Sequence, residues 1–426
     1  MLNILIVTSY LPWPISEGGR VAQLRVLQSL RNDSKFTIIY PVIYPGGELP
    51  AHELAEKFPQ LDIIPVPVYE QPPKIQPLPL RAKIRKQLVR LLRRLFPVPK
   101  VSNNLNIVQK KAPFPWYIFQ PVYPNLVDEL ERQIESKKYD IVQIEFTDLM
   151  SLGVAVSNRI PSIFVHHQLH FMYEQRCSEN GASNSGGSRY LRERMRLEER
   201  EYLKLFDRVI TFSDVDERLL NEFCPGIKAV SSPFPTPEDP VQQVEWNSAG
   251  WDSLCILASE GNPPNVQGLD RFMREVWPIL KIKYPGLKIE VIGKWSDCGR
   301  SQVHAAEDLE YSGFVPDLRT ALKNKIMLVP VWIGSGIRTK ILAAWAAACP
   351  VITTSVGVEG LPGRPGEDYF VADSAEDFVN CCRELVENHE KRNKIAKNGW
   401  NIAKEHFSLE AVRQKRLSIY NELIGK

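Results

Sequence analysis

The chain has 426 residues, which exceeds the length that one hydrophobic core usually supports and predicts two domains. Its net charge of +3, with 44% hydrophobic and 24% charged residues, is ordinary for a globular protein and points to no particular partner. No apolar run reaches the ~18 residues of a membrane span, and the start "MLNILIVTSYLPWP" lacks the basic region of a signal peptide. Seven irregularly spaced cysteines without a CxxC pair indicate reduced thiols and disfavour structural zinc, so we expect a cytoplasmic protein.

Short apolar runs alternate with helical patterns along the whole chain, which is typical of βα units on parallel sheets. In the first half we expect strands at residues 3–9, 36–42, 62–68, 140–146, 161–167 and 207–213. In the second half we expect strands at residues 253–259, 287–293, 325–331, 350–355 and 368–372. Each half therefore has enough strands for a doubly wound sheet of its own.

The segment "SSPFPTPEDPVQQVEWNSAGWD", residues 231–252, is rich in proline and polar residues, which indicates an interdomain linker. The tail "FSLEAVRQKRLSIYNELIGK" predicts an amphipathic helix with Ser408 as its N-cap. We expect domains at 1–235 and 236–407, followed by a terminal helix at 408–426. The predicted fold class is α/β, with two Rossmann-like domains facing across a cleft, because ligands bind beyond the carboxyl ends of open α/β sheets.

The first predicted strand leads into a glycine turn, "SEGGR", before a helix that starts near Arg20. Free amides at the helix start, together with Arg20, suit an anion or an acceptor hydroxyl beside Gly18 and Gly19. A plain tight turn is the alternative. Because the turn is not GxGxxG and no ribose-binding acid is evident downstream, the sequence disfavours a nicotinamide enzyme.

The stretch "FVHHQLHFMYEQR" places His166 and His167 at the carboxyl end of a predicted strand. Since side chains alternate along a strand, we expect only one of the two to face the cleft. A structural role is the alternative for a lone histidine. Together with His170 the pair suggests a metal site, but the HExxH arrangement is missing, so the sequence disfavours metal.

Two further stretches carry weaker signals. Asp214 and Asp216 in "ITFSDVDERLL" form an Asp-x-Asp that binds metal in some transferases, but Ser213 with Asp216 matches a capping box, which we favour. After the first strand of the second half, the turn at residues 262–265 feeds a helix whose free amides face the predicted cleft.

The strongest signal is "GSGIRTKILAAWAAACPVITTSVGVEG", residues 334–360, which predicts a glycine loop, a helix and a buried strand. Gly334 and Gly336 permit close backbone approach, and the following amides lie at a helix start. Arg338 suits bidentate contact with phosphate oxygens, and Lys340 adds a mobile charge. This layout predicts a diphosphate site, and the alternative is a glycine loop with solvated basic residues.

Glu359 and Glu367 have seven residues between them, which is the spacing of a known carboxylate pair in retaining transferases. They follow the strand "PVITT", however, whereas that pair lies on the loop and helix before it. We therefore do not assign them as that pair.

Residues 71–127 contain eleven lysines and arginines and no acid. Within them "RAKIRKQLVRLLRRLF", residues 81–96, predicts a basic amphipathic helix, a pattern that suits an anionic membrane surface. The alternative is a helix packed on the first domain with a solvated basic face. RNA is disfavoured because aromatic residues are not interleaved with the basic ones, so we expect no nucleic-acid partner.

These stretches resemble the family 4 (group 1) glycosyltransferases of GT-B fold. The resemblance rests on the 334–360 stretch together with "PPNVQGLDRFMREVWPIL", "DIVQIEF", "FVHHQLHF" and "EREYLKLFDRVITFSDVD". It covers nearly the whole chain and is most specific in the second half. It implies a terminal helix that crosses back onto the first domain, which would be the acceptor side.

The resemblance implies a retaining transfer of a sugar, of hexosyltransferase type, from a nucleoside diphosphate without a metal or cofactor. The acceptor would be a growing cell-surface polysaccharide or a lipid-linked glycan, at the inner face of the plasma membrane. His167 would lie near the reacting carbon, with His166 as the second candidate. The expected donor-binding residues are Gly18, Gly19, Arg20, Asn265, Ser335, Gly336, Ile337, Arg338, Lys340 and Glu359.

Three positions depart from the family pattern. Ala343 replaces the acid that contacts the donor ribose, Ser335 replaces the first acid of the carboxylate pair, and Glu260 or a neighbour replaces a basic residue. Losing one charge-assisted ribose bond costs about 1.5 to 3 kcal/mol. Two main hypotheses follow: an active transferase, or a non-catalytic GT-B-like subunit that binds a partner or membrane. A phosphorylase or epimerase on the same fold is a third.

Overall fold

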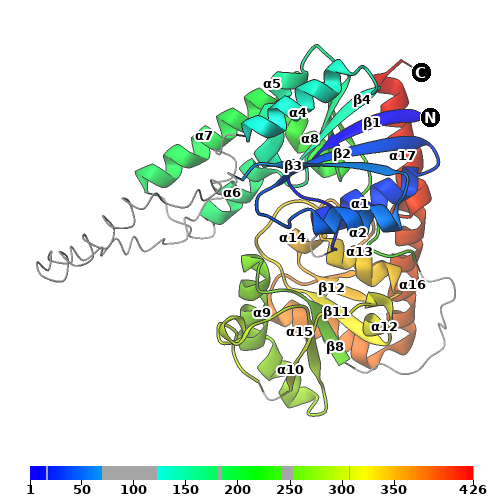
Figure 1. Ribbon diagram of the computed structural model, residues 1–426. Coiled ribbons are helices and arrows are strands. Elements are labelled where there is room, and N and C mark those ends of the chain that lie inside the picture. The colour runs from blue at the N-terminus through cyan, green and yellow to red at the C-terminus, as the bar shows by residue number, and fades with distance from the viewer. Residues whose placement is uncertain (16–17, 70–121, 180–184, 241–252, 307, 426) are drawn as a thin grey trace, which may run out of the picture.

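The computed structural model describes residues 1–15, 18–69, 122–179, 185–240, 253–306 and 308–425. These residues form two α/β units, one above the other in Figure 1. The predicted basic helix at 81–96 lies outside the described residues. Among the helices that the structure describes, none combines the length and hydrophobicity needed to cross a membrane.

The first unit is built on a parallel sheet of seven strands in the order β3-β2-β1-β4-β5-β6-β7. Its strands are β1 (Leu2–Val7), β2 (Ser34–Val42), β3 (Leu61–Pro67), β4 (Ile141–Glu145), β5 (Ser162–Val165), β6 (Arg208–Thr211) and β7 (Ala229–Ser231). Its helices are α1 (Gly18–Leu30), α2 (Leu49–Lys57), α4 (Pro124–Glu135), α5 (Gly153–Val156), α6 (His170–Glu179), α7 (Gly186–Leu203) and α8 (Asp214–Phe223). Central strands such as β4 are buried along their whole length, as strands covered by helices on both faces must be.

The second unit has a parallel sheet of six strands in the order β10-β9-β8-β11-β12-β13. Its strands are β8 (Ser253–Leu257), β9 (Ile289–Ile292), β10 (Leu309–Gly313), β11 (Lys325–Val329), β12 (Val351–Thr353) and β13 (Phe370–Val371). Its helices are α9 (Pro263–Glu275), α10 (Trp277–Lys283), α11 (Asp297–Arg300), α12 (Leu318–Leu322), α13 (Thr339–Ala346), α14 (Ser355–Val358), α15 (Ala375–Glu387) and α16 (His389–His406). The expected α/β class with two Rossmann-like domains is confirmed.

Two strands were not expected from the sequence. β7 has three residues and β10 reads "LEYSG", and each lies at the edge of its sheet. An edge strand has one unpaired side and needs fewer apolar residues than a buried strand, so neither produces a continuous apolar run.

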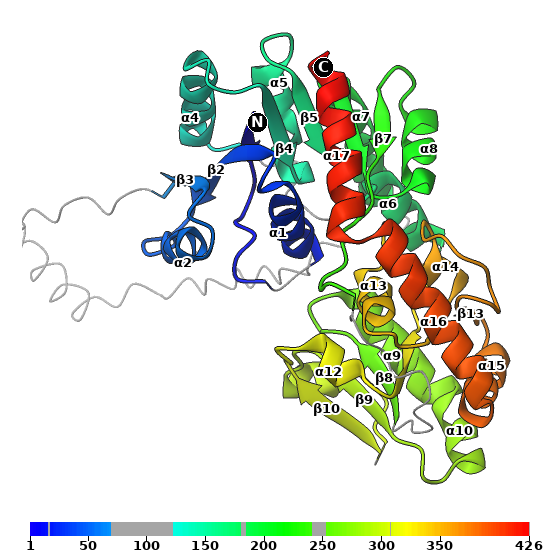
Figure 2. The ribbon, with the colours of Figure 1, turned by 90° about the vertical axis from the view of Figure 1, so that its right-hand side faces the viewer.

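The chain passes between the two units twice, at adjacent positions. The backbone N–H of Thr236, in the first passage, donates to the carbonyl of Phe407, in the second passage, at 3.0 Å. After Phe407, helix α17 (Leu409–Leu423) packs against α1 of the first unit (Figure 2). Arg413 of α17 forms a bidentate ion pair with Asp33, at 2.6 and 2.7 Å. The terminal helix therefore returns to the first unit.

Ser408 begins α17 as predicted, because its hydroxyl accepts a hydrogen bond from the backbone N–H of Ala411 at 3.3 Å. We expect Ser408→Ala to lower the free energy of unfolding by about 1 kcal/mol through loss of this cap. Ser418→Ala, at an exposed position inside the same helix, is the matched control and should cost nothing. Chemical denaturation of both variants measures the difference, and equal values would contradict a capping role.

Candidate functional site

In the two sheets, the edges at which the parallel strands have their carboxyl ends face each other. A Cβ atom on Gly18, at the start of α1, would lie 3.2 Å from Cγ2 of Thr339, at the start of α13. A Cβ on Gly336 would lie 3.3 Å from the carbonyl oxygen of His167. The Ser335 hydroxyl donates to the carbonyl of Leu169 at 3.2 Å. The loops that follow β1, β5 and β11 therefore meet at one junction between the domains, at the edge where open α/β sheets bind ligands.

The glycine turn of the first domain brings α1 close to its neighbours. A Cβ on Gly19 would lie 2.8 Å from the ring of Phe146, so a larger residue cannot occupy this position without a shift. Arg20 donates to the carbonyls of Leu11 and Trp13 at 3.0 and 3.2 Å, and its guanidinium lies 4.6 Å from the Tyr10 ring centroid. In this structure Arg20 holds the β1–α1 loop in place.

His167 lies at the cleft with most of its ring covered. Its side chain is 12% exposed, and Nε2 lies 2.9 Å from Oε2 of Glu145, at the end of β4. The ring stacks on Phe146, with 4.2 Å between the centroids. A neutral imidazole that donates through Nε2 has Nδ1 as its acceptor, so the carboxylate selects the tautomer.

His166 has a different environment and cannot touch a substrate. Its side chain is fully buried, and Nε2 lies 2.8 Å from Oε1 of Glu199, in α7. The same carboxylate accepts from the backbone N–H groups of His170 and Phe171, the first two residues of α6. Burial also lowers the pKa of His170 to about 4, which keeps its ring neutral. His166 and His170 therefore help to fix the start of α6, and only His167 remains a catalytic candidate.

The glycine loop of the second domain has backbone geometry that requires glycine. Gly336 has φ of +75°, in the left-handed region that other residues rarely adopt. A Cβ on Gly334 would collide with Nη2 of Arg338. The loop thus folds tightly around the Arg338 side chain.

Arg338 has donors without acceptors. Nη1 donates to the carbonyl of Ser335 at 2.7 Å, whereas Nε and Nη2 are shielded from solvent and have no hydrogen-bond partner within the described part of the chain. Desolvation lowers the pKa of Arg338 to about 10, although the nearby Glu359 raises it. A buried donor without an acceptor costs free energy, and an anionic ligand would remove that cost.

Lys340 is the second residue of α13, two positions after Arg338. Its Nζ donates to Oδ1 of Asn265, on α9, at 2.7 Å. Desolvation first, and then the charge of Arg338, lower the pKa of Lys340 to about 7. Two basic side chains two residues apart, with no carboxylate paired to Lys340 among the residues that the structure describes, favour an anion at this point.

An ion pair between the two domains lies beside the glycine loop. Arg176, in α6, forms two hydrogen bonds with the Glu359 carboxylate at 2.6 and 2.7 Å and also donates to the carbonyl of Gly334. The sequence alone predicted no role for Arg176. Its position in a helix that begins just after the carboxyl end of β5 is the sequence feature that could have placed it near the other domain.

The remaining site candidates have defined neighbours. Ile337 lies against the position of Gly360, where a Cβ would be 3.3 Å from its Cδ1. Ser213 accepts from the backbone N–H of Asp216 at 3.0 Å and caps α8, as the sequence predicts. Within the described ranges, no three His, Cys, Asp or Glu side chains gather closely enough to hold a metal ion.

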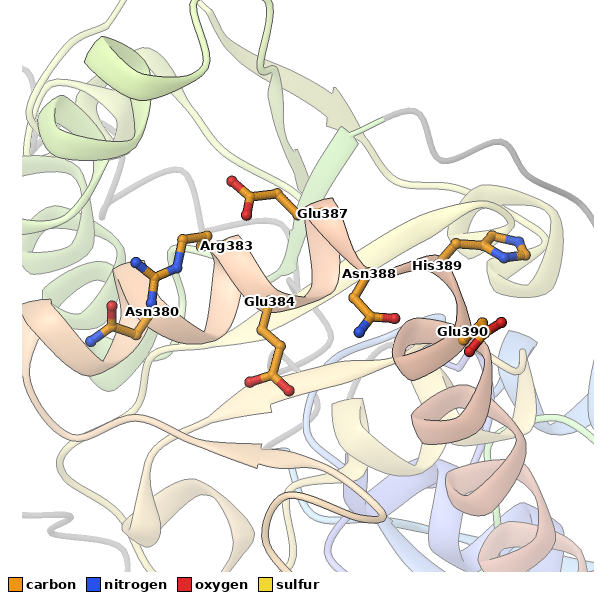
Figure 3. Close-up of a pocket in the computed structure, with 7 residues that line it drawn as sticks. All are labelled: Asn380, Arg383, Glu384, Glu387, Asn388, His389 and Glu390. Carbon is orange, nitrogen blue, oxygen red and sulfur yellow. The ribbon is translucent and has the colours of Figure 1, made fainter.

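A hollow of about 730 Å³ lies elsewhere, along α15 and the start of α16 (Figure 3). None of the candidate donor residues lines it. Its lining mixes cations, carboxylates and amides without an apolar wall: Asn380, Arg383, Glu384, Glu387, Asn388, His389 and Glu390. We assign the candidate site to the cleft.

Comparisons with known proteins agree with this geometry. Residues 254–388 match the family model described as "Glycosyl transferases group 1". Sucrose-phosphate synthase from Thermosynechococcus elongatus superposes with a TM-score of 0.67 at 13% identity, over 99% of both chains. HepE from Anabaena, in a structure described as a complex with UDP, gives 0.66 at 12% identity, over 99% of this chain and 100% of that one.

A third relative is an uncharacterised 44.6 kDa protein in the cps region of Klebsiella pneumoniae, 25% identical over 171 residues. The match spans 37% of this chain and 44% of that protein. The protein thus has the GT-B fold, and residues 254–388 are similar to the group 1 glycosyltransferases.

The low pKa of Lys340 predicts a pH-dependent penalty on stability. The unfolded chain binds a proton on this lysine below about 10.5, whereas the folded protein does so only below about 7, so the penalty grows as pH falls between these values. We expect Lys340→Met to gain stability relative to the parent protein by on the order of 1–3 kcal/mol over that range. Denaturation curves at pH 7 and 10 measure it, with exposed Lys415→Met as control. A difference independent of pH would contradict it.

Proposed function

We propose that the protein transfers a sugar, with retention of anomeric configuration, from a nucleoside diphosphate sugar to a growing cell-surface polysaccharide or lipid-linked glycan. The observation that carries the proposal is Arg338, whose Nε and Nη2 lie without acceptors beside the glycine loop. With Lys340 it offers a diphosphate two cations and the amides at the start of α13. Basic side chains and the amides of a helix N-terminus commonly bind phosphate groups in proteins.

The same groups would assist departure of the nucleotide. Negative charge develops on the diphosphate as the glycosidic bond to it breaks, and fixed cations in a desolvated cleft stabilise that charge. Two cations in this position can supply the charge that a metal supplies in other transferases. We therefore expect a metal-independent, hexosyltransferase-type reaction.

His167 would act at the sugar. It lies on the first domain, directly across from the glycine loop, since its carbonyl oxygen would be 3.3 Å from a Cβ on Gly336. Its fixed ring can hold a sugar hydroxyl by a hydrogen bond and so orient the reacting carbon. Gly18 and Gly19 let the start of α1 lie close against Thr339 and Phe146, so that this helix start would lie beside the donor.

The relatives support a nucleotide-sugar donor and, through the cps region, a polysaccharide acceptor. The Klebsiella protein is described as lying in a cps region, and the structures similar to this chain include HepE with UDP-glucose and TarM from S. aureus with UDP. The basic segment 81–96 adds a sequence-based expectation of contact with an anionic membrane, where a lipid-linked acceptor would lie.

Nucleotide binding tests the donor site. In calorimetric titrations we expect UDP or GDP to bind, and Arg338→Ala to weaken binding about ten- to a hundredfold through loss of charge-assisted hydrogen bonds. Arg274→Ala is the matched control, because this arginine lies 57% exposed on α9 and pairs with Asp270. If the folded parent protein binds neither nucleotide, the non-catalytic subunit becomes the better account, as the loss of the ribose-binding acid at Ala343 would suggest.

Turnover tests the role of His167. We expect His167→Ala to reduce kcat about a hundredfold with little change in nucleotide affinity, because the ring acts on the sugar and not on the diphosphate. Exposed His52→Ala, on α2, serves as control. Release of nucleotide from the bound sugar nucleotide measures kcat, and proton NMR of the product reports whether the anomeric configuration is retained. An inverted product would overturn the retaining assignment.

A further inference from the structure

Helix α17 reaches the candidate site through a chain of buried hydrogen bonds. The Tyr420 hydroxyl donates to Oε1 of Gln143, on β4, at 2.8 Å. Gln143 donates through Nε2 to Oε1 of Glu145 at 2.6 Å. The other oxygen of Glu145 lies 2.9 Å from Nε2 of His167. Tyr420, Gln143 and Glu145 are 0%, 1% and 4% exposed, so water does not compete for these bonds.

The direction of each hydrogen bond in this chain follows from which group donates and which accepts. Tyr420 donates its hydroxyl proton, which requires the Gln143 carbonyl to face α17 and its amide NH₂ to face Glu145. A carboxylate only accepts, so Nε2 of His167 must carry the proton. The Glu145 carboxylate therefore sets the imidazole tautomer, and the Tyr420 hydroxyl, through Gln143, holds that carboxylate in place.

A second contact route leads from α17 to the same ring. Arg416, which is 1% exposed, has its guanidinium carbon 5.8 Å from the ring centroid of Phe212. The Phe212 centroid lies 5.2 Å from that of His167, whose other face stacks on Phe146. The ring is therefore held by packing as well as by hydrogen bonds.

We propose that Tyr420 is a positioning residue for the transfer reaction: acting through Gln143, it holds the Glu145 carboxylate in the position that keeps His167 in the Nε2–H tautomer and in one orientation against the glycine loop. The proposal rests on the proposed function, because the imidazole matters for turnover only if a sugar is bound beside it. A preorganised ring has no reorientation to make as the reaction proceeds. The crossing helix is thereby a part of the reaction apparatus as well as a link between domains.

Tyr420→Phe tests the proposal, because it keeps the ring and removes only the hydroxyl. Long-range ¹⁵N–¹H spectra of histidine-labelled protein report the tautomer, with the His167 signals assigned from His167→Gln. We expect a single Nε2–H form in the parent protein and a mixture of tautomers in the variant. We also expect kcat to fall about three- to tenfold, with the nucleotide Kd unchanged.

Tyr369→Phe is the matched control, since it removes another buried hydroxyl, which donates to the carbonyl of Gly363 at 3.1 Å. It should change neither the His167 signals nor kcat. Unaltered His167 signals in Tyr420→Phe, or equal changes in both variants, would overturn the proposal.

Glu145→Gln provides a second test if Tyr420→Phe does not fold. It breaks the chain next to the imidazole with little change of shape and should alter the His167 tautomer directly. In the double variant, Tyr420→Phe should add no further loss of kcat, because the link it serves is already broken. Additive losses would show that Tyr420 acts independently of His167.

The two proposals fail in different ways. The spectra are recorded without nucleotide, so the tautomer result tests the network whether or not a donor binds. Failure of the parent protein to bind UDP and GDP would overturn the proposed function, and unaltered spectra in both chain variants would overturn the role of Tyr420.

Discussion

The candidate site depends on a pair of basic side chains that are held between the two domains with few acceptors among the described residues. Arg338 and Lys340 begin α13 next to a glycine loop, and desolvation lowers the pKa of each. Shielding such donors from water without satisfying them is unfavourable, and folded proteins retain this arrangement mainly where a ligand completes it. The glycine loop, the neighbouring Asn265 and the facing first domain all serve to keep these cations in place.

Contacts between the domains come from the same loops that would bind the donor. Arg176 bridges to Glu359 and Gly334, and Ser335 bonds to the β5–α6 loop. These residues flank Arg338, so a ligand that bound there would also act on the contacts between the domains, as expected of a site built between two domains.

The fold was largely predictable from the sequence because buried parallel strands produce continuous apolar runs. β7 and β10 were not predicted, because they are short, partly polar edge strands. The cations of α13 were found because glycines and basic residues lie together in one local motif. The Tyr420–Gln143 bond joins residues 277 positions apart, and no local pattern could reveal it. The burial of His166 likewise depends on Glu199, a distant residue on α7.

The most direct test of the account is a crystal structure of the protein with UDP or GDP, whichever binds. The account predicts that the diphosphate lies beside the glycine loop and accepts hydrogen bonds from Nε or Nη2 of Arg338, with Lys340 within ion-pair distance. A nucleotide bound elsewhere, with the free donors of Arg338 still unpaired, would contradict the central claim that these cations form a donor site.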